Sequence, residues 1–69
     1  MKTLVINAHE DDAHKASLLV SINNLTEKII EIVFKERFPW MSYCIVEEDD
    51  FKAEYEGRDD EYYFTKIKG

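Results

Sequence analysis

The chain has 69 residues, of which fifteen are acidic and nine are basic, so its formal net charge at pH 7 is −6. This length allows one folded domain, residues 1–69, because two hydrophobic cores could not be buried in so few residues. An apolar content of 45% with one Trp, four Tyr and four Phe residues indicates a folded chain. The excess of acid argues against direct binding to nucleic acid or to anionic membranes.

The N-terminal region and the single cysteine predict a cytoplasmic location. Only four uncharged residues separate Lys2 from Asn7, which is too short for a signal-peptide core, and no apolar run approaches the length of a membrane span. Cys44 has no partner for an intrachain disulfide, and its apolar neighbours suggest a small buried side chain in a reducing compartment.

The first half of the chain is expected to contain two strands and one helix. Residues 1–8 have the β-branched content of a strand, residues 9–15 are polar and predict a loop, and Leu18, Val20 and Ile22 alternate as in a second strand over residues 16–23. The alternative is one helix over residues 13–37, which gives the order βαβββ. Such a helix would be nearly 40 Å long, which is too long for the short strands of this chain.

The central helix is expected over residues 24–38. Asn24 is a suitable N-cap, Glu27 completes a variant of the capping box, and Pro39 ends the helix. Its predicted apolar stripe consists of Leu25, Ile29, Ile30, Ile32 and Val33.

Three further strands are expected at residues 41–47, 51–56 and 61–68, with turns at 48–50 and 57–60. The predicted fold class is therefore α+β: a small antiparallel β-sheet with one central α-helix packed on one face, in the order ββαβββ. Apolar residues occur on both faces of several predicted strands. Since one helix covers one face, we expect part of the other face to be exposed and to form a homodimer or partner interface.

A cluster of histidines and acids near the N-terminus is a candidate metal or acid–base site. The segment contains His9, Glu10, Asp11, Asp12 and His14. These are metal-ligating residue types, but their spacing matches no compact ligand pattern. The chain also has no phosphate loop and no nucleophile motif. We therefore expect no cofactor, no metal and no enzymatic activity, and keep a metal-dependent enzyme as the least favoured alternative.

The segment from residue 47 to residue 61 carries most of the negative charge. It holds nine acids against only Lys52 and Arg58. On strands, carboxylates about 6.8 Å apart along a strand and about 4.8 Å apart across strands would form a lattice comparable to a row of phosphates. The predicted partner-binding residues are Glu47, Glu48, Asp49, Asp50, Glu54, Glu56, Asp59, Asp60 and Glu61, with Tyr55 and Tyr62 as aromatic anchors. The alternative is that these acids only keep the sheet soluble.

In size and charge the chain resembles small phage-encoded inhibitors, among them anti-CRISPR and anti-restriction proteins, some of which are acidic DNA mimics. The resemblance covers no residue pattern, so it assigns no site residue. Together with the acidic segment, it implies an inhibitor that blocks a basic, nucleic-acid-handling protein. The alternative function is a homodimeric structural or adaptor domain that associates through an apolar sheet face.

Overall fold

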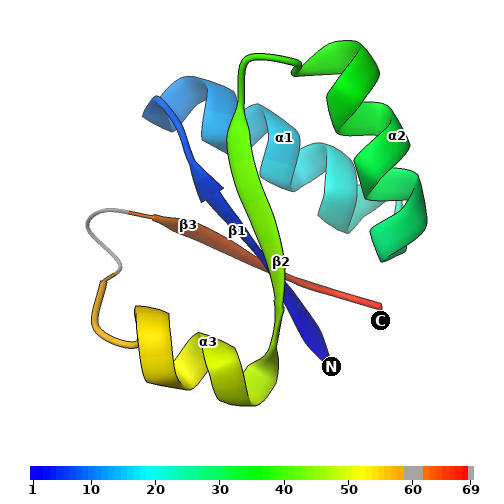
Figure 1. Ribbon diagram of the computed structural model, residues 1–69. Coiled ribbons are helices and arrows are strands. Elements are labelled where there is room, and N and C mark those ends of the chain that lie inside the picture. The colour runs from blue at the N-terminus through cyan, green and yellow to red at the C-terminus, as the bar shows by residue number, and fades with distance from the viewer. Residues whose placement is uncertain (59–61, 69) are drawn as a thin grey trace.

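The protein is an α+β fold with strands and helices in the order βααβαβ (Figure 1). The computed structural model describes residues 1–58 and 62–68. Within them lie β1 (Lys2–Asn7), α1 (Glu10–Ile22), α2 (Glu27–Arg37), β2 (Ser42–Glu47), α3 (Glu48–Tyr55) and β3 (Tyr63–Ile67). The predicted α+β class is confirmed, whereas the predicted order ββαβββ and its alternative βαβββ are both wrong.

The three strands form one antiparallel sheet in the order β2-β1-β3. The central strand β1 pairs with both neighbours, so that Leu4 lies opposite Ile45 on one side and Thr65 on the other. Four consecutive β1 residues, from Thr3 to Ile6, are buried. The strands predicted at residues 1–8, 41–47 and 61–68 are therefore confirmed, the last of them over Tyr63–Ile67.

The segment predicted as a loop and a second strand is the helix α1. His9 is its N-cap and accepts a hydrogen bond from the backbone N–H of Asp11, and three acids occupy the first turn, where the helix dipole favours negative charge. The buried side chains of α1 are Ala13, Ala16 and Val20, which are spaced for one helical face. The small side chains of the two alanines let α1 pack closely on the sheet.

The turn after α1 separates it from α2 and explains why no single long helix forms. Asn24 has a positive φ of 51°, and the backbone N–H groups of Asn24 and Leu25 donate to the carbonyls of Ser21 and Val20 at 3.3 and 3.1 Å. This pair of bonds is the Schellman motif, in which asparagine is one of the few residues that tolerate the left-handed position. Asn24 therefore ends α1, and the prediction that it is the N-cap of the central helix is wrong. The central helix α2 begins at Glu27 after the N-cap Thr26.

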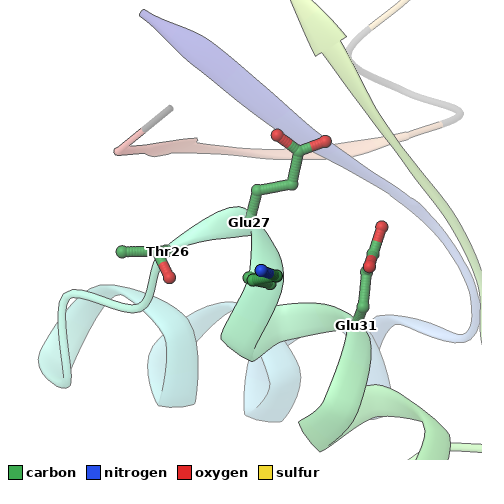
Figure 2. A pocket seen from close by; sticks show the side chains of 4 residues that line it. Thr26, Glu27 and Glu31 are labelled. Carbon is green, nitrogen blue, oxygen red and sulfur yellow. The ribbon is translucent and has the colours of Figure 1, made fainter.

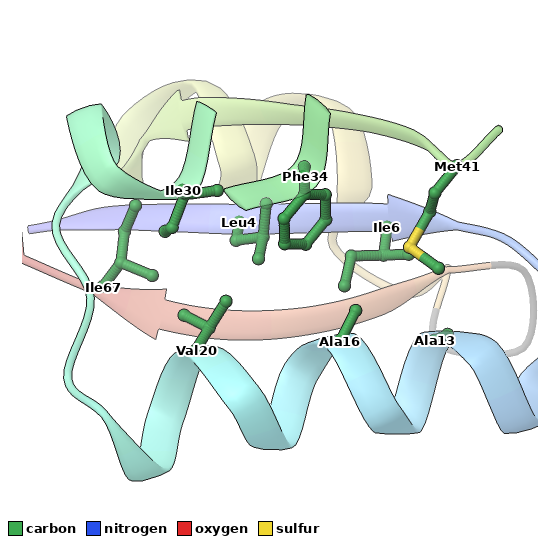
Figure 3. Close-up of a cluster of buried hydrophobic side chains, with 9 residues drawn as sticks. All are labelled: Leu4, Ile6, Ala13, Ala16, Val20, Ile30, Phe34, Met41 and Ile67. Atoms are coloured by element: carbon green, nitrogen blue, oxygen red, sulfur yellow. The ribbon is translucent and has the colours of Figure 1, made fainter. Parts of the chain in front are cut away.

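Helices cover both faces of the sheet. In Figure 1, α1 and α2 lie on one side of the strands and α3 lies on the other. Figure 3 shows the core between the sheet and the first two helices, where Leu4, Ile6, Val20, Ile30 and Phe34 meet. On the opposite face α3 packs against β1 and β2, and Val5 is only 2% exposed. Helix α3 thus covers the centre of this face at Val5, while Cys44 on the same face is exposed and Val46 is half-buried, so part of the expected second face remains accessible.

Helix α3 replaces the predicted turn and strand at residues 48–56. Phe51 and Tyr55 lie four residues apart and are half-buried on one helical face, while Ala53 between them is exposed. The apparent alternation of these three residues is thus a helical i,i+4 pair with an exposed alanine between its members. Within the described residues, no helix is long and apolar enough to cross a membrane.

Candidate functional site

The acids predicted to bind a partner lie mainly on α3. Glu47 ends β2, Glu48, Asp49 and Asp50 form the first turn of α3, Glu54 lies in its last turn, and Glu56 follows it. The remaining three acids of the predicted set, Asp59, Asp60 and Glu61, lie outside the described residues. The prediction that these side chains form a lattice on strands is wrong, because a helix carries four of the six that the structure describes.

Two of the acids at the start of α3 are paired with lysines. A Glu48 carboxylate oxygen lies 3.8 Å from Lys66 Nζ and 4.0 Å from Lys52 Nζ, and Glu47 lies 3.6 Å from Lys2 Nζ. Partial neutralisation leaves these two carboxylates with less attraction for a partner. Neither of them is expected to act as a strong phosphate surrogate.

Three acids on the outer side of α3 form the surface that we call the acidic face: Asp49, Asp50 and Glu54. All three are exposed, and none forms an ion pair within the described part of the chain. At 100° per residue they surround the exposed Ala53, opposite the half-buried Phe51. The acidic face therefore presents unneutralised negative charge to solvent.

An aromatic cluster attaches α3 to the sheet. The ring centroids of Phe51 and Phe64 are 4.7 Å apart in an edge-on arrangement. The ring centroid of Tyr55 lies 5.2 Å from that of Tyr62 and 6.2 Å from that of Phe64. Edge-on pairs at these distances add stability beyond the burial of their area. Tyr55 and Tyr62, predicted as partner anchors, are half-buried in this cluster, so their observed contacts hold α3 in place.

Cys44 and Tyr55 connect β2 to α3 directly. The Cys44 Sγ atom lies 3.5 Å from the Tyr55 hydroxyl oxygen, and this hydrogen bond, together with burial, raises the pKa of Tyr55 to about 12. Cys44 is exposed, so the prediction that it is a buried side chain is wrong. The hydrogen bond between Cys44 and Tyr55 helps to hold α3 against β2.

A polar pocket of about 410 Å³ lies at the start of α2, lined by Thr26, Glu27, Lys28 and Glu31 (Figure 2). Lys2 Nζ donates a hydrogen bond to the Glu27 carboxylate, which raises the pKa of Lys2. This contact joins the first residue of β1 to the first residue of α2. The ammonium group of Lys2 thus links α2 to Glu47, the residue that precedes α3.

The histidine and acid segment forms the start of α1. His9 caps the helix, and the ring of His14 packs edge-on against Tyr63 at 5.3 Å. The described residues contain no group of three or more His, Cys, Asp or Glu side chains placed to hold a metal ion. The contacts of both histidines are thus explained by helix capping and packing.

Sequence reasoning missed an exposed apolar surface on the outer side of α1 and α2. Ile29 and Ile32 were assigned to the helix core, yet they are 43% and 55% exposed, because Ile30 and Phe34 point into the sheet instead. On α1, Leu18 and Ile22 are 57% and 75% exposed. The available signal was the excess of apolar residues in α2, which a single buried stripe cannot accommodate.

Compared with protein families, curated proteins and solved structures, the chain matches no family model, no curated protein and no solved structure.

Proposed function

We propose that this protein acts by binding a positively charged surface of another protein through the acidic face of α3, and that it thereby occupies a site that otherwise holds a nucleic-acid backbone. One observation supports the proposal most directly: Asp49, Asp50 and Glu54 are exposed and unpaired on a helix whose other side is fixed by aromatic packing. As an inhibitor, the protein would compete with nucleic acid for that site.

The spacing of charge on α3 is comparable to that of a nucleic-acid strand. Eight residues of helix span about 12 Å, at 1.5 Å per residue. Four acids over this length average roughly one per 3 Å, and the three without ion pairs average roughly one per 4 Å, while each DNA strand carries one phosphate per about 3.4 Å of axis. Because ion pairs occupy Glu48, three of the four acids are free to contact a partner.

The attachment of α3 supports this role energetically. A helix that is already ordered by Phe51 and Tyr55 loses little conformational entropy when it binds. Unpaired surface charge also speeds the encounter with a partner of opposite charge, and this attraction weakens as salt increases. A high sensitivity of binding to ionic strength is therefore the expected signature.

The test compares two neutralised variants that change charge equally. In the first, Asp49→Asn, Asp50→Asn and Glu54→Gln remove the acidic face. In the matched control, Glu10→Gln, Asp11→Asn and Glu31→Gln remove two exposed first-turn acids of α1 and one acid of α2. Circular dichroism and urea unfolding establish that both variants fold.

Binding is measured as displacement of fluorescent duplex DNA from an arginine-rich peptide at low and high salt. With about 0.2–1 kcal/mol for each exposed charge pair, the α3 variant should compete roughly tenfold less well than the wild type, and the control nearly as well. If both variants lose competition equally, only net charge matters and the proposed site is wrong. An α3 variant that competes at full strength would also refute it.

A further inference from the structure

The outer surface of α2 carries an apolar centre between two opposite charges. Ile32 is 55% exposed and lies on the side of α2 opposite the buried Ile30 and Phe34. Lys28 precedes it by four residues and Glu36 follows it by four, and both are exposed. Residues at this spacing form one continuous ridge on a helix. We call Lys28, Ile32 and Glu36 the α2 ridge.

Further exposed apolar surface lies beside the ridge. Ile29, 43% exposed, lies one helical turn before Val33 and on the same side of α2. A groove of about 280 Å³ between the two helices has an apolar lining of Leu19, Leu25 and Val33 and a polar lining of Asn23, Glu36 and Arg37. An apolar surface of this kind on a small protein commonly marks an interface.

The charges of the ridge are available for a partner. Neither Lys28 nor Glu36 forms an ion pair within residues 1–58 and 62–68. Each lies about 6 Å along the helix axis from Ile32, one on either side, at 1.5 Å per residue. When a ridge with this pattern meets a copy of itself in the opposite direction, each charge faces its opposite and the apolar centres coincide.

We infer that α2 pairs with α2 of a second copy of this chain about a two-fold axis at Ile32, so that Lys28 of each copy faces Glu36 of the other. The two ridges then run side by side in opposite directions. Parallel ridges of this type correspond to the commonest class of helix packing, with axes crossing at about 50°. The interface is isologous, as in most homodimers, because the same surface contributes from both copies.

Charge complementarity selects a second copy as the occupant of this surface. An unrelated partner would have to supply a negative and a positive charge, 12 Å apart, around an apolar contact. A second copy of α2 running in the opposite direction supplies this pattern, because its own Glu36 and Lys28 flank its Ile32. Chains of this length often gain stability from association, because a single small core provides little. This inference does not depend on the function proposed for α3, which lies on the other side of the sheet.

The test reverses the charge of Lys28 and of Glu36, first in two single variants and then in one double variant. Lys28→Glu places two acids opposite each other at two symmetric positions, and Glu36→Lys does the same with two bases. Each single variant should raise the dimer dissociation constant at least tenfold, measured by sedimentation equilibrium. The double variant K28E/E36K restores opposite charges across the interface and should return the constant to within about threefold of wild type.

The matched control makes the same two charge changes on the far side of the sheet. Glu54→Lys and Arg58→Glu reverse one acid and one base that are both exposed, four residues apart rather than eight, and they should leave dimerisation unchanged. Ile32→Ser removes the apolar centre; because Ile32 is already exposed, the variant should fold normally and be monomeric. A wild-type chain that stays monomeric at high concentration, or a double variant that fails to recover, would overturn the inference.

Discussion

A single residue decides where the first helix ends. Asn24 occupies a left-handed position, with φ of 51°, and two backbone hydrogen bonds close the turn behind it. A left-handed conformation costs an ordinary L-residue about 1–2 kcal/mol, whereas glycine adopts it freely. Asn24→Ala should therefore lower the free energy of unfolding by about 1 kcal/mol, and Asn24→Gly should change it by less. Urea denaturation of the three proteins measures both effects. Equal stability of the alanine variant and the wild type would contradict this account of the turn.

The contact between Tyr55 and Cys44 should make the free energy of unfolding depend on pH in the alkaline range. In the folded protein the pKa of Tyr55 is about 12, whereas in the unfolded chain the pKa of this phenol has its ordinary value near 10. Ionisation of the unfolded chain therefore lowers stability as pH rises from about 10 to 12, and below 10 this contribution is constant.

Cys44→Ala removes the hydrogen bond named as the main cause of that shift, so the pKa of Tyr55 should fall toward 10. Absorbance titration of tyrosinate in the wild type and in C44A measures the change. Tyr55→Phe identifies which part of the curve belongs to Tyr55. If the titrations of C44A and wild type coincide, the sulfur contact does not control this phenol.

At the scale of elements, sequence identified the strands and missed two of the helices. The strand β1 was predictable because its β-branched and apolar residues form an uninterrupted run that is buried on both faces. The helices α1 and α3 were misassigned because three alternating apolar residues fit a strand, although only Val20 among those of α1 is buried. The signal that could have corrected both was a run of three acids in the first turn, Glu10 to Asp12 and Glu48 to Asp50.

The candidate site was predictable in composition and not in geometry. The described acids of the segment are mostly exposed, as a charge count suggests, but their arrangement on α3 follows from a helix that was not predicted. The position of Tyr55 depends on tertiary contacts with Tyr62 and Phe64, which no local pattern encodes. The same holds for Ile29 and Ile32, since either side of α2 could have faced the sheet.

At the scale of the whole molecule, the sheet separates two chemically different surfaces. Figure 1 places α3, which carries the acidic face, across the strands from α2, which carries the α2 ridge. Each helix packs on the sheet through a different aromatic pair. The ring centroids of Phe34 in α2 and Tyr43 are 4.6 Å apart, and those of Phe51 in α3 and Phe64 are 4.7 Å apart. Substitutions on one surface should therefore affect the other little, because distant sites without shared partners act additively.

The net charge of −6 should also limit stability, and its effect depends on where each acid lies. Glu54 is four residues after Asp50 and near the C-terminal, negative end of the α3 dipole, so two interactions disfavour it. Glu54→Gln should raise the free energy of unfolding by about 0.5 kcal/mol and reduce the stabilisation that added salt gives the wild type.

Glu31→Gln is the control. It removes the same charge, but Glu31 lies four residues before Lys35, which is the favourable order for a helical ion pair, so this variant should gain no stability. Urea unfolding at low and high salt compares them. Equal gains from both substitutions would show that total charge alone limits stability and that the clustering of acids on α3 is irrelevant to it.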